Sequence, residues 1–536
     1  MLTLRQGLRI GLVAGLVLLG AAADQAYASA VSKEGTEDLR PGESRPNIVF
    51  FLVDDLGYYD IGAYGGDMYE TPHVDQLARD GMRFTNAYAA APVCSPTRAS
   101  LLSGQYPARV GITDYLPGRP DAPTQPLLQP NDRSHFPHAD ASLAEVLKSQ
   151  GYSTHFIGKW HLGGEEESSL PTDHGFMTNV GGNEMGNPGD GGYYSPYNIT
   201  EIQDTVDGQY LTKRLTDEAV QVIGAQEADR PFLLMMSFYT VHSPLQAPDS
   251  LIAKYEDKMT GHDYRNPRFV LEQNPDMLSY DSTTWAEKQE WLNRPAFSEG
   301  ASLPRRTTKV MRRQMTPTFA AMVDYMDHSV GRILGALRRA GLEEETLVVF
   351  YSDNGGQASP GRTSTSVAPL RAGKGWLYEG GLRVPLIVKY PGRVEPGSVS
   401  DTPVSSPDFY PTLLDLAGVP LRPQQHKDGR SFESVLLQSS SLDREELYWH
   451  WPHYSNHGQQ APAGAIRSGR YKLIEYYENN TRQLFDLQTD PEEKNNLAAN
   501  RPSLADSLTQ RLHEWRQRVS AEMPRPNPSY EPQEGN

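Results

Sequence analysis

The sequence contains one cysteine, Cys94, among 536 residues. A single cysteine cannot form a disulfide within the chain, whatever the redox state of the compartment. The stretch APVCSPTRASLLSG, residues 91–104, places Cys94 in a Ser/Pro/Thr turn that the pattern predicts to open a helix. Composition alone leaves three roles for this residue: a buried inert thiol, an intermolecular link or a reactive group.

Long apolar runs are absent after the N-terminal segment. There, Arg5 and Arg9 precede an apolar run over residues 10–23, and residues 26–30 supply small side chains suited to cleavage. This arrangement predicts a signal peptide over residues 1–30, because the run is short for a membrane anchor. We expect an exported protein, periplasmic or secreted, with no membrane span in the mature chain.

The chain also lacks an excess of basic residues. Its 67 acidic side chains outnumber 50 lysines and arginines, which gives a formal net charge of −17. This balance argues against nucleic acid and anionic membranes as general partners. An anionic substrate would therefore need a local basic pocket.

Five apolar runs are typical of buried strands, and they alternate with segments of helical periodicity. The helical segments are residues 71–81 and 318–341. This alternation predicts a large α/β domain, residues 46–430, with a mainly parallel central sheet flanked by helices. The strand-like runs are PNIVFFLVDD (46–55), YSTHFIGKW (152–160), PFLLMMSFYT (231–240), TLVVFYSDN (346–354) and VPLIVKYPG (384–392).

Two stretches interrupt this alternation: the Gly-rich residues 179–198 and the polar, weakly periodic residues 243–316. Both are interpreted as loops or insertions, which either wall a site or vary without function. From about residue 431 the pattern favours a small α+β domain, residues 431–522, with a short antiparallel sheet and one helix. The Pro-rich tail, residues 523–536, is expected to be disordered or draped on the surface.

Four of the predicted strands end in charged or metal-competent side chains. Ligands of an open parallel sheet bind beyond the carboxyl ends of its strands, so these side chains mark a candidate site. The oxygen donors suit Ca²⁺ or Mg²⁺ rather than zinc, and a cation would explain adjacent aspartates. Each residue taken singly could instead cap a helix or face solvent. The strand-end residues are Asp54, Asp55, Lys159, His161, His242, Asp353 and Asn354.

Three further observations concern cations. Arg98 follows Cys94 in the turn, Lys159 ends a strand, and Lys374 lies in a Gly-rich stretch whose backbone can approach a ligand closely. A metal ion facing these cations across a cleft would form a binding site for a compact oxyanion. Phosphate esters and sulfate esters both fit this description.

These blocks together resemble the type I sulfatases of the alkaline-phosphatase-like superfamily. CSPTRASLLSG (94–104) is similar to the family's Cys-x-Pro-Ser/Thr-Arg signature. The resemblance spans roughly residues 46–425, and its other blocks occur in the family's order. They are GKWHLG (158–163), VHSPL (241–245), SDNGG (352–356) and GKGWLYEGGLRVPLIV (373–388).

The resemblance implies that a maturation enzyme oxidises Cys94 to formylglycine, whose hydrate is the nucleophile and can expel sulfate after transfer. It also implies a Ca²⁺, or Mg²⁺, held by Asp54, Asp55, Asp353, Asn354 and residue 94. The family's roles carry over to the matching positions: Arg98 steadies the hydrate, Lys159 and Lys374 bind sulfate oxygens, His161 assists aldehyde regeneration, and His242 with Lys374 protonates the leaving oxygen.

Three other functions compete with sulfate ester hydrolysis as interpretations of these residues. A formylglycine-dependent phosphonate monoester or phosphodiester hydrolase shares the motif. A two-metal phosphatase would need a second Asp/His ligand set and a Ser or Thr nucleophile. A non-catalytic binder of sulfated glycans would keep Cys94 as a thiol.

Export favours a sulfated carbohydrate, such as a polysaccharide-derived oligosaccharide, as the substrate. Aromatic and arginine side chains of the Gly-rich loop and the small domain suit sugar stacking and carboxylate pairing. The alternative is that they pack the small domain against the large one. The candidates are Tyr194, Tyr197, His450, His453, Tyr454 and Arg467.

Overall fold

The computed structural model describes residues 45–530, apart from residues 203–204, 228, 266, 276–283, 294–306, 360–363 and 439. The predicted signal peptide therefore lies outside the described residues. None of the helices in the described part of the chain combines the length and the apolar content that crossing a bilayer requires.

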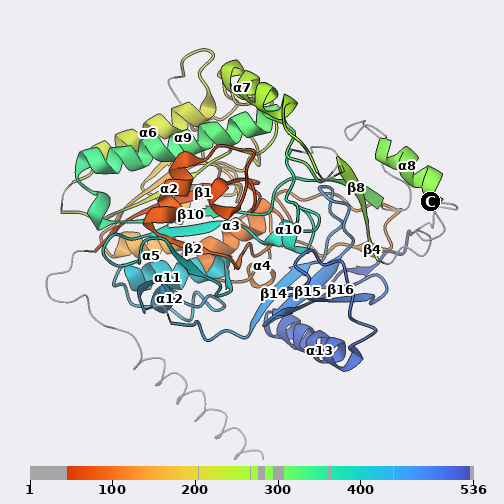
Figure 1. Cartoon of the computed structure of the whole chain (residues 1–536). Helices are drawn as coiled ribbons and strands as arrows, with labels where there is room; N and C mark the ends of the chain where they lie inside the picture. Colours follow the sequence, from red (N-terminus) through yellow and green to blue (C-terminus); the bar gives the residue numbers. More distant parts are fainter. Residues whose placement is uncertain are drawn as a thin grey trace, which may run out of the picture.

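An eight-stranded sheet forms the centre of the molecule (Figure 1). All of its strands run in one direction except β11, which is antiparallel to both of its neighbours. The mainly parallel sheet is confirmed. In spatial order the strands are β12 (Ser398–Ser400), β2 (Met82–Phe84), β11 (Leu386–Lys389), β10 (Thr346–Ser352), β1 (Asn47–Val53), β7 (Phe232–Ser237), β5 (Ser153–Gly158) and β6 (Thr178–Val180).

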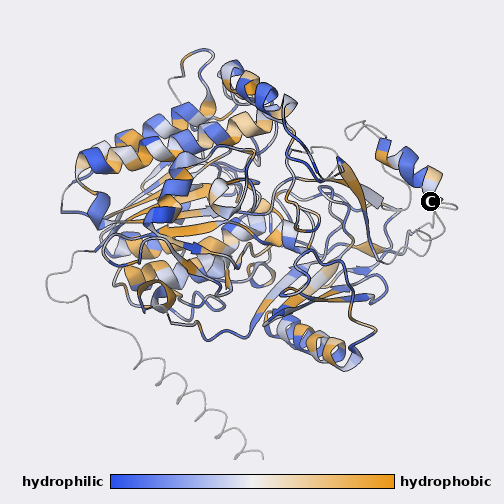
Figure 2. Cartoon of the chain, viewed as in Figure 1, coloured by the Kyte–Doolittle hydropathy of each residue, from blue (hydrophilic) through white to orange (hydrophobic). Residues whose placement is uncertain are grey.

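Helices cover both faces of this sheet, which is why its strands are continuous apolar runs (Figure 2). In β1, Phe50 packs into the core on one face and Phe51 into the core on the other. The first face carries α3 (Cys94–Ser103), α5 (Leu143–Ser149), α11 (Phe409–Leu416) and α12 (Glu433–Gln438). The second carries α2 (Pro72–Asp80), α6 (Leu211–Gly224), α7 (Asp249–Thr260) and α9 (Pro317–Ala340).

A second, smaller sheet lies beside the first and is wholly antiparallel. Helix α13 (Pro502–Arg518) packs on its outer face through Leu508, Leu512 and Trp515. Its inner face packs through Trp449 and other side chains against Trp376 and Tyr378 of the large unit. A domain limit at residue 430 stays a prediction. The strands are β14 (Glu446–Trp451), β15 (Ala463–Ser468), β16 (Tyr471–Tyr476) and β17 (Arg482–Asp486).

The stretch 243–316 contains more regular structure than its weak periodicity indicates. Besides α7, it holds α8 (Trp285–Asn293) and an antiparallel pair of strands, β8 (Phe269–Gln273) and β9 (Thr307–Met311). Asn274, just after β8, donates a hydrogen bond to the Gln459 carbonyl and accepts one from the Ala461 amide. The insertion is thereby tied to the small sheet's loop.

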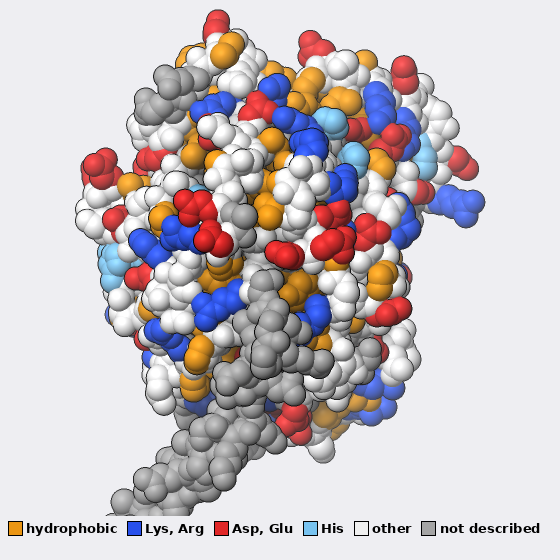
Figure 3. Space-filling view, turned by 90° about the vertical axis from the view of Figure 1, so that its left-hand side faces the viewer, with side chains coloured by type: hydrophobic (Ala, Val, Ile, Leu, Met, Phe, Trp, Pro, Cys, Tyr) orange, Lys and Arg blue, Asp and Glu red, His pale blue; other side chains and the backbone are white. Residues whose placement is uncertain are grey.

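The described part of the C-terminal tail is draped on the surface. Its strand β18 (Arg525–Pro526) pairs antiparallel with β4 (Leu127–Leu128). On the molecular face in Figure 3, acidic and basic side chains are interspersed.

Removing a core ring from the central strand β10 is expected to destabilise the fold strongly. Phe350→Ala deletes a fully buried side chain, so the free energy of unfolding should fall by about 3–5 kcal/mol. Chemical denaturation followed by fluorescence measures this loss. The control is Val399→Ala on the edge strand β12, where the side chain is 54% exposed; a change there above about 0.5 kcal/mol would contradict this account of the core.

Candidate active site

Four neighbouring parallel strands bring the predicted strand-end residues to one edge of the sheet. Strands β10, β1, β7 and β5 are consecutive in the sheet, so their carboxyl ends lie side by side. Asp54 and Asp55 follow β1, Asp353 and Asn354 follow β10, and Lys159 follows β5. All five are buried.

Cys94 is the first residue of α3, as the turn predicts. Its Sγ lies within 4.8 Å of carboxylate oxygens of Asp54 and Asp353. Pro96 is tolerated there because the first turn of a helix needs no amide donors. The turn is fixed by side chains on both sides: Thr97 Oγ1 accepts from the Ala91 amide, and Ser95 Oγ accepts from the Leu116 amide. Burial raises the pKa of the Cys94 thiol.

Arg98, one helical turn after Cys94, ties three strand ends together. Its Nε and Nη2 donate to Asp353 Oδ2 at 2.9 and 2.7 Å. Its Nη1 donates to the Lys159 carbonyl and to Ser237 Oγ, both at 2.7 Å. The guanidinium is 3% exposed, so these contacts fix it in one position.

Two lysines pair with the adjacent aspartates. Lys159 Nζ donates to Asp54 Oδ2 at 2.8 Å, and Lys374 Nζ lies 2.6 Å from Asp55 Oδ1. Burial raises the pKa of Asp54 well above its usual value despite Lys159. Burial also acts to raise the pKa of Asp55, but the charges of Lys374 and His242 outweigh it, and the net pKa of Asp55 is lowered. Asn354 Nδ2 also donates to Asp55 Oδ1 at 2.7 Å.

Two buried oxygens of this cluster have no hydrogen-bond partner among the described residues. They are Asp54 Oδ1 and Asn354 Oδ1. Unsatisfied buried acceptors are costly, and a cation bound between them would remove that cost. Hard oxygen donors of this kind fit Ca²⁺ or Mg²⁺.

The two histidines of the site are buried and held by backbone carbonyls. His161 Nε2 lies 2.6 Å from the Leu116 carbonyl, and His242 Nδ1 lies 2.7 Å from the Ser243 carbonyl. Burial lowers the pKa of both imidazoles well below the usual value. His242 Nε2 faces Asp55 Oδ2 at 3.7 Å, while His161 Nδ1 has no hydrogen-bond partner in the described part of the chain.

Part of the Gly-rich loop packs directly on His161. A side chain at Gly186 would bring its Cβ within 2.6 Å of the His161 ring, so only glycine fits. In the same loop the buried Tyr193 hydroxyl contacts the carbonyls of Tyr239 and His242 at 2.6 and 2.8 Å. The loop therefore walls the site at Gly186 and Tyr193. The substrate role of Tyr194 and Tyr197 stays a prediction.

A loop of the small unit closes over the Lys374 segment. Gln357 Nε2 donates to the His457 carbonyl, and a side chain at Gly375 would collide with Ser455 and His457. Asn456 Nδ2 donates to Tyr115 Oη. Sequence reasoning missed these residues, because irregular loops carry no periodicity that says which side chains meet.

The six residues predicted to contact the substrate form hydrogen bonds and ring contacts with residues outside the Cys94 cluster. Tyr194 packs on Tyr210, and Tyr197 donates to the Gln209 carbonyl. The other four are buried in the small unit or at its junction with the large one. His450 contacts Tyr477 and the Glu522 carbonyl, His453 contacts Thr113 and Gln129, Tyr454 contacts Glu478, and Arg467 contacts Tyr88. Of the six, His453, Tyr454 and Arg467 contact the large unit, as the packing alternative predicts. The substrate role of all six stays a prediction.

The chain matches the family model described as "Sulfatase" over residues 46–419. A second model, "N-sulphoglucosamine sulphohydrolase, C-terminal", matches residues 372–518. A "Sulfatase" of Formosa agariphila is 31% identical over 93% of both chains. "Arylsulfatase A" of Homo sapiens is 32% identical over 87% of this chain and 81% of its own length.

Among solved structures, a crystal structure of Ps i-CgsB in complex with k-i-k-neocarrahexaose has a TM-score of 0.67 and 27% identity. It covers 88% of this chain and 93% of its own.

The buried histidine His453 is expected to make stability depend on pH. Burial lowers its pKa to about 3, so the unfolded chain takes up a proton near pH 6.5 while the folded chain does not. Stability is therefore lost as pH falls, by about 1 kcal/mol between pH 7 and pH 5.5. His453→Gln should remove this part of the loss in denaturation curves at the two pH values. His262→Gln, at an exposed position, should leave the loss unchanged, and equal pH dependence in all three proteins would contradict the assignment.

Proposed function

The chain belongs to the sulfatase family and is a sulfuric ester hydrolase, and on that premise we propose that it removes sulfate from a sulfated carbohydrate. The proposal includes a formylglycine made from Cys94 and a bound Ca²⁺, with Mg²⁺ as the alternative ion. The observation that carries it is Cys94 at the start of α3, facing two carboxylates within a ring of buried cations.

The residues around Cys94 fit a divalent cation. Asp54, Asp55, Asp353 and Asn354 would hold it together with residue 94, and two of their oxygens lack other partners. Such an ion supplies Lewis acidity toward a sulfate oxygen. Three carboxylates and three cations already meet here, which is costly to bury unless each charge is compensated.

The chain's own cations would bind and orient the ester. Lys159 and Lys374 lie on the two sides of the aspartate pair, so an ester between them meets an ammonium group on each side. Arg98 holds Asp353 and the Lys159 carbonyl in place, and we assign it the role of fixing residue 94. These interactions bind the charge of the sulfate group and leave the alcohol part to the surrounding loops.

Proton transfer is assigned to the two histidines and Lys374. His161 would accept a proton from the hydrate of residue 94 during release of sulfate, and its Nδ1 is the ring nitrogen without a partner. His242, whose Nε2 faces Asp55, would act with Lys374 on the leaving oxygen.

The carbohydrate assignment rests on a solved relative and on the predicted export. The solved structure similar to this chain was crystallised with a neocarrahexaose. The predicted signal peptide favours a periplasmic or secreted enzyme, which would act on polysaccharide fragments. Maturation requires a formylglycine-generating partner enzyme.

A phosphonate monoester or phosphodiester hydrolase is the second candidate, because it would share the nucleophile. The family model and the relatives named for sulfatase activity favour sulfate. A non-catalytic binder would keep the Cys94 thiol, so the state of Cys94 and turnover together separate the three functions.

The protein matured in its native host is expected to carry an aldehyde at residue 94. The tryptic peptide FTNAYAAAPVCSPTR, residues 84–98, should show the mass of formylglycine or its hydrate, and the protein should release sulfate from an aryl sulfate and a sulfated oligosaccharide. Cys94→Ala should lower turnover by about 10³-fold or more, because the nucleophile is lost. An unmodified thiol despite active maturation, or phosphonate turnover exceeding sulfate turnover, would overturn the proposal.

Removal of divalent ions is expected to abolish activity and to lower thermal stability. Without the ion, Asp54 Oδ1 and Asn354 Oδ1 stay buried without partners. Dialysis against EDTA followed by Ca²⁺ or Mg²⁺ should remove and restore both sulfate release and the unfolding temperature. The same treatment of Asp54→Asn/Asp353→Asn should leave its unfolding temperature unchanged, whereas full activity of the wild type after verified metal loss would contradict the assignment.

A further inference from the structure

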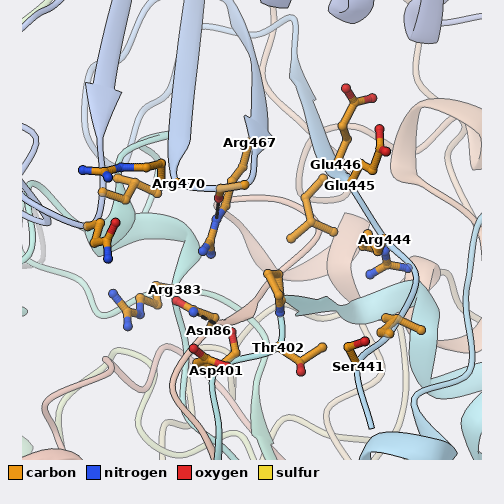
Figure 4. Close-up of a pocket in the computed structure, with 16 residues that line it drawn as sticks. Asn86, Arg383, Asp401, Thr402, Ser441, Arg444, Glu445, Glu446, Arg467 and Arg470 are labelled. Carbon is orange, nitrogen blue, oxygen red and sulfur yellow. Dashed lines mark hydrogen bonds between the residues drawn. The ribbon is translucent and has the colours of Figure 1, made fainter.

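A pocket of about 570 Å³, lined by none of the active-site residues described above, lies between the large unit and the small sheet. Arg467 and Arg470 reach into it from the hairpin between β15 and β16 (Figure 4). Arg383 and Thr402 line it from the large unit. Arg467 is one of the six side chains predicted as substrate contacts, and it lines this pocket.

The four arginines that line the pocket differ in whether a carboxylate neutralises their charge. Arg444 is paired with Asp408, and Arg470 is paired with Asp486. Arg467 instead donates to two neutral oxygens, the Gly469 carbonyl and the Tyr88 hydroxyl, and its guanidinium lies over the Tyr88 ring. It is only 8% exposed, so this charge is nearly buried without an adjacent carboxylate among the described residues.

One carboxylate, Glu379, interacts with three cations beside the pocket, two of them directly and Arg467 through the Tyr88 hydroxyl. Lys472 Nζ lies 3.0 Å from Glu379 Oε1, and Arg383 Nη1 lies 3.8 Å from Glu379 Oε2. Glu379 Oε2 also accepts from the Tyr88 hydroxyl that Arg467 contacts. Burial by itself raises the pKa of Glu379, but Lys472, Arg383 and Arg467 together lower it. Glu379 therefore compensates two cations within 4 Å, Lys472 and Arg383, with one negative charge.

A second buried carboxylate offsets part of this excess. Glu493 Oε1 lies 3.0 Å from Lys472 Nζ. Lys472 is thereby shared between two carboxylates. Arg383, which also lines the pocket, has Glu379 as its ion-pair partner and donates its Nε to the Thr85 carbonyl. The acidic residues that line the pocket offset little of the arginine charge. Asp401 and Glu445 are exposed to water, which screens their charges, and Glu446 pairs with Arg511.

We infer that this pocket is a second oxyanion site, in which Arg467 and Arg383 bind a sulfate or carboxylate group away from Cys94. Arginine suits such groups because its planar guanidinium donates to two oxygens at once. The cavity is larger than one inorganic sulfate, so it also admits a sulfated or carboxylated sugar residue. The oxyanion would come from one of two sources, free sulfate or an anionic glycan.

The first test locates the anion directly. Crystals of the full chain are soaked in selenate, a sulfate analogue whose selenium gives an anomalous signal. We expect one selenium peak between Arg383 and Arg467, separate from any peak near Cys94. A peak near Cys94 alone would overturn the second site and leave the proposed function intact.

The second test changes the charge of the pocket without removing a buried side chain. Thr402→Glu places a carboxylate opposite the arginines, and Thr402→Gln is the matched uncharged control. Thr402→Glu should weaken sulfate binding at this site about tenfold, as should Arg467→Gln, while Thr402→Gln should leave it within about twofold. Equilibrium dialysis with labelled sulfate measures this at constant ionic strength, and equal binding by the Glu and Gln variants would overturn the inference.

Steady-state kinetics then distinguishes the two sources. If a glycan group occupies the pocket, Thr402→Glu raises KM for a sulfated oligosaccharide about tenfold and leaves an aryl sulfate unchanged. If free sulfate is the occupant, KM stays unchanged for both substrates and only sulfate binding at the pocket weakens. Equal losses on both substrates would place the effect at the catalytic centre and contradict a separate site.

Discussion

The arrangement on which the rest of the site depends is a set of buried ion pairs at the ends of β1 and β10. Asp54, Asp55 and Asp353 meet Lys159, Lys374 and Arg98 with almost no exposure to water. Ions removed from water lose several kcal/mol of solvation each, and only close pairing recovers it. The position of every charged residue is therefore set by its partner, and one displaced group would leave another buried charge uncompensated.

The sheet brings the paired side chains close enough to interact. The parallel strands β10, β1, β7 and β5 end at one edge, and hydrogen bonds between their ends hold the register beyond the strands. The Asp353 amide donates to the Val53 carbonyl, and the Val241 amide donates to the Asp54 carbonyl. Asp55 and His161 have positive φ angles of 60°, which non-glycine residues adopt at a cost. The surrounding contacts therefore hold these two side chains in directions that a relaxed backbone would not give.

The sequence predicts the central strands and their polar ends well, because a strand buried on both faces is a continuous apolar run. The run 46–55 contains all of β1 and ends with the two aspartates that enter the site. The spatial order of the strands is not evident from such runs, since consecutive strands of the sheet are far apart in sequence. The Cys94 turn and the family resemblance added what strand patterns cannot give, namely which helix start faces the strand ends.

Prediction was weakest where side chains meet across irregular segments. The Gly-rich loop presents three tyrosines within five residues, and the sequence does not show that Tyr193 enters the core while Tyr194 stays partly exposed. In the small sheet, alternation separates two faces, but both faces are covered, one by α13 and the other by the large unit. His450 and His453 are therefore buried although their residue types suggested a surface role. Arg467 differs from both. Its guanidinium reaches the junction between the two units with no carboxylate partner among the described residues, and this junction is where the Arg467 pocket forms.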